Sequence, residues 1–128
     1  MRLVQVNKEK FITHLKLFGN KLNYFSMDSY NDYYFLYYTF GGVALRKKKN
    51  RIYEVNLLWS SQKGLGKEIL QEVERITKYF FNGKYLVLNC LGDKLKKYYE
   101  EKGFKVYLKL KNYENTNDKY YYEMIKEL

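Results

Sequence analysis

The sequence predicts a protein of the α/β (α+β) class that forms a single domain over residues 1–128. Three observations support this prediction. A β-prone segment at 52–59 passes through a loop containing two glycines into an amphipathic helical segment that ends near residue 80. Further β-prone and helical segments come before and after this unit, with no repeat or linker between them. Hydrophobic residues make up 46% of the 128 residues, which is enough for one hydrophobic core.

The helical segment after the loop carries its apolar residues on one face. These residues recur at spacings of four, four, three and four: Leu65, Ile69, Val73, Ile76 and Phe80. A strand that enters a helix through a Gly-x-Gly turn, here Gly64-Leu65-Gly66, is good geometry for binding an anion such as phosphate. The reason is that the first N–H groups of a helix have no partner inside it, and the helix dipole adds partial positive charge.

Two common phosphate-binding motifs do not fit this loop. A P-loop would need Gly at 61 and Ser or Thr at 68, where the chain has Ser61 and Glu68. A dinucleotide-binding fingerprint would need a third Gly or Ala at 69, where the chain has Ile69. Taken alone, the glycine pair is equally consistent with a helix-initiating turn that binds no ligand.

The segments before the central unit predict a strand at 1–6, then a helix with Asn7 as its N-cap that stops at Gly19-Asn20. Residues 21–32 mix apolar and polar side chains, which indicates either a loop on the substrate side or an ordinary connection.

Two more strands are then expected before the central unit. The first, at 33–40, ends at Gly41-Gly42, and the second begins at 43–46. Residues 47–50 form the turn into the strand at 52–59, so three antiparallel strands lead into the glycine loop.

The segments after the central unit follow the same reasoning, and Cys90 falls in an apolar run that predicts a buried strand. They are a turn at 82–83, a strand at 84–90, a helix at 93–102 closed by Gly103, a strand at 104–110, a polar loop at 112–118 and a last strand at 120–125 that can pair with the preceding one. In the helix, Leu95, Tyr98 and Tyr99 lie on or near one face.

The composition argues against several classes of site. A single cysteine, Cys90, excludes a disulfide framework and a Cys-based zinc site, and a lone His14 argues against a His-centred triad or metal cluster, so we expect no metal. No apolar run approaches the roughly 20 residues needed to span a bilayer. The N-terminus lacks the apolar core of a signal peptide, so we expect a cytoplasmic (intracellular) protein.

The formal net charge of +10 raises the question of nucleic-acid binding. The lysines are spread along the chain, and the one dense run, Arg46-Lys47-Lys48-Lys49, falls where a solvated hairpin tip is expected. We therefore do not expect nucleic acid as a partner, and an acidic substrate for a basic face stays open.

Two stretches resemble motifs of the GNAT acyltransferase superfamily. The loop Ser61-Gln62-Lys63-Gly64-Leu65-Gly66 is similar to the coenzyme A pyrophosphate loop, Gln/Arg-x-x-Gly-x-Gly/Ala, and matches both glycines, with Ser61 at the Gln/Arg position. The segment from Gly92 to Phe104 keeps the Tyr-x-x-x-Gly-Phe end of a second motif, with Gly92 in place of Asn and Leu95 in place of Ala. The order of predicted strands and helices is also that of the GNAT fold, a mixed, largely antiparallel central sheet flanked by helices.

This resemblance implies transfer of an acetyl group from acetyl-CoA to a primary amine by direct attack in a ternary complex, without a metal. It implies that backbone N–H groups of the loop bind the pyrophosphate, that the pantetheine arm lies along the splayed fourth strand, and that Asn89 contacts the pantetheine or the acceptor. The implied cofactor-binding residues are Leu57, Leu58, Trp59, Gln62, Lys63, Gly64, Leu65, Gly66, Lys67 and Asn89.

The resemblance also implies two catalytic residues. Tyr99 matches the tyrosine that protonates the leaving thiolate, and Glu54 is the candidate base that accepts the proton of the amine through a water molecule. Asp28 and Asp32 are alternative bases. A bulge in the fourth strand would aim an N–H at the thioester oxygen. Packing of Tyr99 in the core and a solvated Glu54 remain the alternatives to these roles.

A second reading follows from the departures at Ser61 and Gly92: a catalytically degenerate GNAT-like module that binds a protein partner or an acyl-CoA. A third is a small basic domain that binds nucleic acid through exposed tyrosines. For an enzyme, the acceptor is open between a small-molecule amine, a peptide N-terminus and a lysine side chain. Exposed strand edges and many aromatic residues leave a homodimer open as well.

Overall fold

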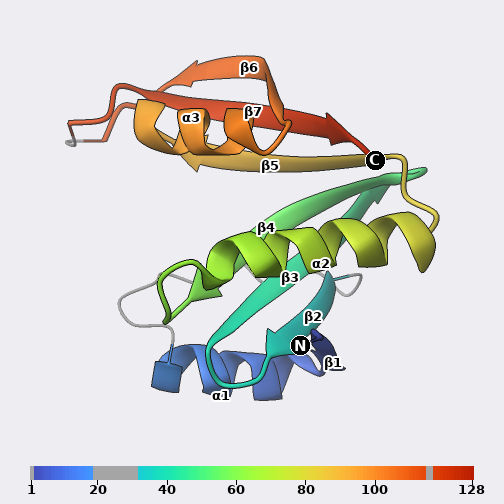
Figure 1. The fold of residues 1–128 in the computed structure, drawn as a ribbon. Helices are drawn as coiled ribbons and strands as arrows, with labels where there is room; N and C mark the ends of the chain where they lie inside the picture. The colour runs from blue at the N-terminus through green and yellow to red at the C-terminus, as the bar shows by residue number, and fades with distance from the viewer. Residues whose placement is uncertain (1, 19–31, 115–116) are drawn as a thin grey trace.

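The computed structural model describes residues 2–18, 32–114 and 117–128 (Figure 1). The elements follow the order that the sequence predicts: β1 (Val4–Val6), α1 (Lys8–Phe18), β2 (Asp32–Tyr37), β3 (Gly41–Lys49), β4 (Ile52–Ser60), α2 (Leu65–Tyr79), β5 (Tyr85–Leu91), α3 (Asp93–Glu101), β6 (Lys105–Lys111) and β7 (Tyr120–Glu127). The predicted stop of α1 at 19–20, the connection up to residue 31 and the candidate base Asp28 lie outside the described residues.

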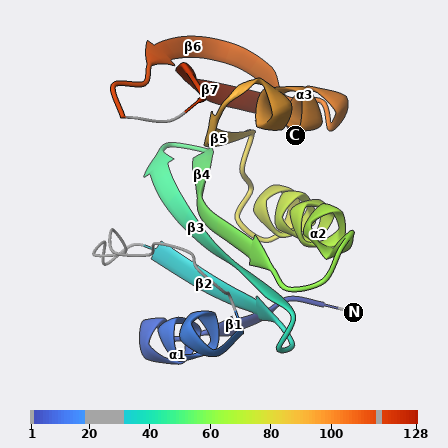
Figure 2. The same cartoon turned by 90° about the vertical axis from the view of Figure 1, so that its left-hand side faces the viewer.

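The strands form one seven-stranded sheet in the order β1-β2-β3-β4-β5-β7-β6. All neighbouring strands are antiparallel except β4 and β5, which are parallel. The predicted mixed, largely antiparallel sheet is therefore confirmed. Helices α2 and α3 cover one face of the sheet, while α1 lies against the opposite face near β2 and β3 (Figure 2).

This arrangement produces two hydrophobic cores, one on each face. The larger core holds Ile69 and Val73 of α2 with Leu86, Leu88 and Met124 of β5 and β7. The smaller core consists of Phe11 and Leu15 of α1 with Tyr34, Leu36, Ala44 and Trp59 of strands β2 to β4. Successive strand residues point to opposite faces, so each of β2, β3 and β4 contributes to both cores.

Helix α1 begins as predicted. The side chain of Asn7 accepts a hydrogen bond from the backbone N–H of Lys10 at 2.8 Å, which satisfies one of the free donors of the first turn. Phe11 and Leu15, four residues apart, then bury the inner face of the helix.

The connection between β2 and β3 differs from the sequence prediction. Strand β2 ends at Tyr37, the chain turns at 38–40, and Gly41-Gly42 lies inside β3 rather than in the turn. The reason is close packing. A Cβ atom on Gly41 would overlap the Cδ1 atom of Ile69, and one on Gly42 would come within 2.7 Å of the Nε1 atom of Trp59. Gly41 lets α2 pack closely against β3, and Gly42 leaves room for the Trp59 side chain of the neighbouring strand. No local sequence pattern reveals these contacts.

The basic run was also misplaced by the prediction. Residues 46–49 belong to β3, and the chain reverses at Asn50 and Arg51, where Arg51 adopts a φ of 63°. Residues 46–51 are all exposed, so the charged side chains are solvated as expected.

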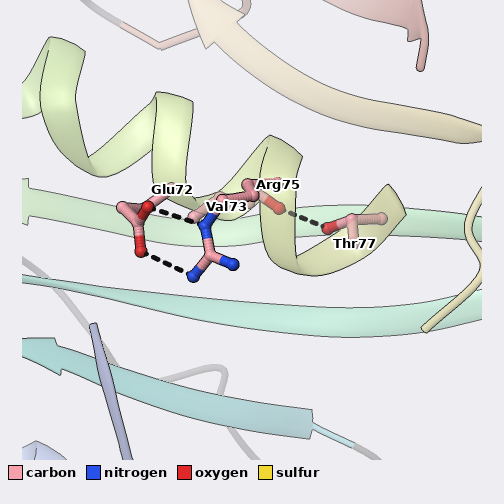
Figure 3. A network of polar contacts seen from close by, with 4 residues as sticks. All are labelled: Glu72, Val73, Arg75 and Thr77. Atoms are coloured by element: carbon pink, nitrogen blue, oxygen red, sulfur yellow. Dashed lines mark hydrogen bonds and ion pairs between the residues drawn. The ribbon is translucent and has the colours of Figure 1, made fainter. Parts of the chain in front are cut away.

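The buried face of α2 agrees with the predicted stripe except at its end. Phe80 lies beyond the last helical residue and is 72% exposed, whereas Leu70 and Thr77 are buried. The Thr77 hydroxyl donates to the carbonyl oxygen of Val73 at 2.7 Å, which satisfies this buried polar group (Figure 3). Arg75 donates two hydrogen bonds to Glu72 (Figure 3), and this guanidinium lowers the pKa of the Glu72 carboxyl.

Strand β7 pairs with β6 as predicted, and it also pairs with β5 on its other side. Strand β6 is consequently the last strand of the sheet, and all its residues are exposed. Its alternation of apolar and charged residues therefore does not mark a buried face.

Candidate active site

Strands β4 and β5 separate from each other along their length. They pair only where Ile52 to Val55 lies beside Tyr85 to Leu88, yet β4 continues to Ser60 while still paired with β3. The two parallel strands therefore diverge into a V-shaped opening at their C-terminal ends. The carboxyl ends of parallel strands are a frequent position for ligand sites in α/β proteins.

A β-bulge lies where the opening begins. Ala44 of β3 is paired with Leu57, and the next residue, Leu45, is paired with Val55, so Asn56 has no partner in β3. A bulged residue leaves its backbone groups outside the regular ladder and bends the strand. Asn56 therefore lies where β4 bends, and its backbone groups lie outside the hydrogen-bond ladder with β3.

The glycine loop connects the end of β4 to the start of α2. Gly64 occupies the N-cap position with φ 86° and ψ −16°, a left-handed conformation that favours glycine. Among the described residues no side chain caps this helix, so the N–H groups of its first turn after Leu65 remain available to an anion. Ser61 holds the loop in place, because both its hydroxyl and its backbone N–H donate to the carbonyl oxygen of Phe40, at 3.1 and 2.7 Å.

A cavity of about 540 Å³ lies against this loop. Its lining residues come from the loop, the first turn of α2 and the outer side of α3: Ser60, Ser61, Gln62, Lys63, Gly64, Gly66, Lys67, Tyr98 and Lys102. Three lysines, Lys63, Lys67 and Lys102, thus surround the N-terminus of α2, and together they favour a ligand with several negative charges.

Tyr98 and Lys102 line the cavity but were not among the predicted site residues. Tyr98 lies on α3 and Lys102, four residues later, is the C-cap of that helix; the ammonium of Lys102 lies 4.7 Å from the centre of the Tyr98 ring. The i, i+4 spacing places them on one side of the helix, which was visible in the sequence. Which element that side would face was not visible, because it depends on how α3 packs beside the loop.

Comparisons with known proteins give a clear result for the fold. No protein-family model matches the chain, and no curated protein matches it in sequence. In contrast, an IAA acetyltransferase from Bacillus cereus superimposes with a TM-score of 0.77 at 15% identity, covering 98% of both chains. This chain has the GNAT fold.

Two further structures with the GNAT fold are similar over nearly the whole chain. The ribosomal-protein-S18-alanine N-acetyltransferase from Escherichia coli gives a TM-score of 0.77 at 12% identity, covering 98% of this chain and 92% of that one. A GNAT family acetyltransferase from Elizabethkingia anophelis with acetyl-CoA bound gives 0.65 at 19% identity, covering 95% and 84%. The similarity is thus one of fold, with little sequence in common.

The residues expected beside the cofactor on β4 do not share one face of the sheet. The side chain of Trp59 is 2% exposed and, like that of Leu57, packs in the core beneath α1. The side chain of Leu58 packs on the α2 side, and its Cδ2 atom would lie 3.9 Å from a Cβ atom on Gly66. Leu57 and Trp59 can therefore reach a ligand near the loop only through their backbone.

Leu65 is buried, as its position in the apolar stripe of α2 predicts. Its side chain is 5% exposed and belongs to the α2 core, and its backbone N–H donates to the carbonyl oxygen of Gln62 at 3.3 Å. Leu65 fixes the start of the helix but does not line the cavity.

Tyr99 lies on the inner side of α3, facing the larger core. Its ring contacts Tyr98 and Phe104 edge-on, with centroids 5.1 and 5.8 Å apart, and it packs against the same core as Leu58. Burial raises the pKa of Tyr99 to about 12, with smaller contributions from Tyr98 and Cys90. The hydroxyl is therefore held in its protonated form, which is the form that can donate a proton.

Glu54 and Asn89 lie on the opposite face of the sheet from Tyr99. Tyr53, beside Glu54, is buried in the α2 core, and so are Leu88 and Cys90, the neighbours of Asn89. The Glu54 carboxylate forms an ion pair with the Lys48 ammonium at 3.3 Å. Asn89 is exposed. The GNAT fold therefore distributes the predicted site residues over both faces, on either side of the opening between β4 and β5.

The alternative base Asp32 is not suited to that role. Its side chain is 1% exposed, it accepts a hydrogen bond from the Tyr34 hydroxyl at 3.3 Å, and its carboxylate lies 4.0 Å from Arg46. It begins β2, two strands away from β4. We interpret Asp32 as a residue that stabilises the β2–β3 pair.

Two further findings concern the whole described part of the chain. Within residues 2–18, 32–114 and 117–128, no group of three or more His, Cys, Asp or Glu side chains is arranged to hold a metal ion. None of the described helices is both long enough and apolar enough to cross a membrane.

Proposed function

We propose that this protein is an N-acetyltransferase that transfers the acetyl group of acetyl-CoA to a primary amine by direct attack in a ternary complex. The observation that carries the proposal is the succession of three features from the middle of β4 to the start of α2: the bulge at Asn56, the V-shaped opening and the uncapped N-terminus of α2. They meet three separate needs of this reaction, namely a backbone donor for the thioester oxygen, space for the pantetheine arm and a site for the pyrophosphate.

In this proposal the cavity at the glycine loop binds the pyrophosphate. The N–H groups of the first turn of α2 after Leu65 donate to the phosphate oxygens, and Lys63, Lys67 and Lys102 neutralise their charge. Beyond Val55, β4 no longer pairs with β5, so its backbone edge can hydrogen-bond to the amides of the pantetheine arm. The arm would then pair with β4 as an additional strand does. Leu58 supplies an apolar contact on the same side.

The chemical step then needs two proton transfers. As the amine nitrogen forms a bond to the carbonyl carbon, the carbon–sulfur bond breaks, and the backbone N–H of Asn56 stabilises the negative charge that develops on the oxygen. Tyr99 gives its proton to the departing thiolate. Glu54, on the acceptor side of the sheet, receives the proton of the amine through a water molecule.

Binding of acetyl-CoA, measured by calorimetry, tests the proposal. Gly64 is unsuitable for substitution because its φ of 86° would strain any side chain, whereas a Cβ atom on Gly66 meets nothing closer than 3.9 Å. Gly66→Glu therefore adds a negative charge at the cavity with little strain, and Gly66→Ala is the matched control. Two unit charges about 4 Å apart repel by about 4 kcal/mol at an effective dielectric constant near 20, so Gly66→Glu should weaken binding at least about 100-fold.

The proposal requires that the wild type and Gly66→Ala bind acetyl-CoA with affinities within a few-fold of each other. A folded wild-type protein that does not bind acetyl-CoA would refute it. Binding without acetyl transfer to any primary amine would instead support the non-catalytic module that binds acyl-CoA.

A further inference from the structure

A second cavity lies on the face of the sheet opposite to the glycine loop. It measures about 320 Å³ and is lined by Lys48, Lys49, Ile52, Val87, Tyr107 and Ile125. Ile52, Val87 and Ile125 come from the neighbouring strands β4, β5 and β7 and form an apolar floor. Its volume is at the lower end of the range of about 300–1,000 Å³ typical of small-molecule sites.

The position of this cavity connects it to the predicted acceptor side. Ile52 and Glu54 are two residues apart on β4, so both point to this face, and Val87 is the residue directly beside Glu54 on β5. Asn89 follows two residues after Val87, at the point where β4 and β5 separate. The cavity therefore lies on the same face of the sheet as Glu54 and Asn89, and Lys48 and Lys49 place one end of it at the β3–β4 hairpin.

Two lysines and two carboxylates lie around the cavity, and they differ in their partners. The Glu54 carboxylate already has the Lys48 ammonium as its partner at 3.3 Å. The carboxylate of Glu123, on the same face of β7 as Ile125, accepts a hydrogen bond from the Tyr107 hydroxyl. Lys49, by contrast, makes no ion pair with any described residue. The Tyr107 hydroxyl is neutral, so Glu123 keeps its negative charge, and Lys49 is the lysine of the cavity lining without a carboxylate partner among the described residues.

We propose that the acceptor is a primary amine with an apolar chain and a carboxylate at its far end, and that Lys49 binds this carboxylate. The inference rests on the proposed acetyltransferase function. The amine lies near Glu54, and the chain covers the apolar floor. Lys49 is paired with Ile52 in the β3–β4 ladder, and Glu54 is two residues further along, a distance of about 7 Å along a strand. A chain of about five carbons spans a similar length.

Lys48 and Lys49 disfavour a second ammonium at the hairpin end of the cavity. A second ammonium at the far end of the chain would approach Lys49 and compete with Lys48 for Glu54. This distinction can be tested with three molecules that share one carbon chain: 5-aminopentanoate, pentylamine and 1,5-diaminopentane, whose far ends are negative, neutral and positive.

The experiment measures binding of each molecule by calorimetry in the presence of CoA and, separately, kcat/KM for its acetylation by the wild type. We expect 5-aminopentanoate to be preferred over pentylamine by about tenfold, and pentylamine over the diamine, in both measurements. Lys49→Gln should remove the preference for the carboxylate, and Lys49→Glu should reverse it. Lys47→Glu is the matched control because it makes the same charge change on β3. Lys47 is paired with Tyr53, whose side chain faces the α2 core, on the other face of the sheet. This variant should keep the wild-type order of preference for the three molecules.

Equal affinity for the three molecules, a preference for the diamine, or no binding of any of them would overturn the inference. Failure of the proposed function gives a different result: the order of affinities would be retained in the binding measurement while no acetylated product forms.

Discussion

Replacing Tyr99 by Phe removes one hydroxyl group and leaves the packing of the ring in place. The ring lies between Tyr98 and Phe104, with centroid distances of 5.1 and 5.8 Å, and these contacts involve its apolar part. We therefore expect the free energy of unfolding to change by less than about 1 kcal/mol, as for other exchanges that conserve the volume of a packed side chain.

The expected effect on catalysis follows from the environment of the hydroxyl. Burial raises the pKa of Tyr99 from 10.0 to about 12. This shift means that burial destabilises the phenolate relative to the phenol by about 2.7 kcal/mol compared with an exposed tyrosine. Tyr99 consequently keeps its proton at every practical assay pH, and the raised pKa makes it a weaker acid than an exposed tyrosine, so the role of donor to the thiolate rests on its position. Proton transfer from a positioned acid typically contributes a factor of about 10² to 10⁴, so kcat of Tyr99→Phe should fall by at least about 100-fold.

Release of the free thiol, followed under saturating acetyl-CoA and amine, measures this effect. Tyr98→Phe is the matched control, since Tyr98 is the neighbouring residue on α3 but lines the cavity at the glycine loop. We expect its kcat to remain within about threefold of the wild type, and the affinity of Tyr99→Phe for acetyl-CoA to change little. A kcat of Tyr99→Phe within threefold of the wild type, in a variant with an unchanged unfolding transition, would refute the role of Tyr99 as proton donor.

Three predictions concern stability, each measured by urea denaturation. Gly41→Ala should lower the free energy of unfolding by about 1–3 kcal/mol, because its Cβ atom would overlap Ile69, and an unchanged midpoint would show that α2 shifts freely. Asn7→Ala should cost about 1 kcal/mol through loss of the helix cap while Asn7→Ser does not, and equal losses would argue against capping. The pKa of Tyr107, raised by burial and a hydrogen bond to Glu123, and that of Tyr122, raised by its hydrogen bond to Asp93 and by burial, are both about 12 in the folded protein. Both pKa values in the folded protein lie above the unfolded value of 10. The contribution of the two tyrosines to stability is therefore complete below pH 10 and should be lost as the pH rises toward 12. A urea midpoint that stays constant over this pH range would contradict the prediction.

Local patterns were sufficient to predict the elements themselves. The spacing of Leu65, Ile69, Val73 and Ile76 identified the inner face of α2, and Asn7 identified the start of α1, because both signals depend on residues within one helix. The loop around Gly64 and Gly66 was predicted for the same reason, since a turn into a helix is specified by a few adjacent residues. The prediction for Gly41-Gly42 was wrong because the contacts that require glycine there come from α2 and β4.

The sequence by itself therefore determined the order of strands and helices, the glycine loop and the two short motifs that resemble those of the GNAT superfamily. Only the tertiary structure decided how these parts form a candidate site. The divergence of β4 from β5, the bulge at Asn56 and the placement of Tyr98 and Lys102 beside the loop all depend on pairing and packing between distant segments. Alternation along a strand tells which residues share a face, but it does not tell which strand lies beside it or where the pairing stops, because those depend on the sum of contacts over the whole sheet.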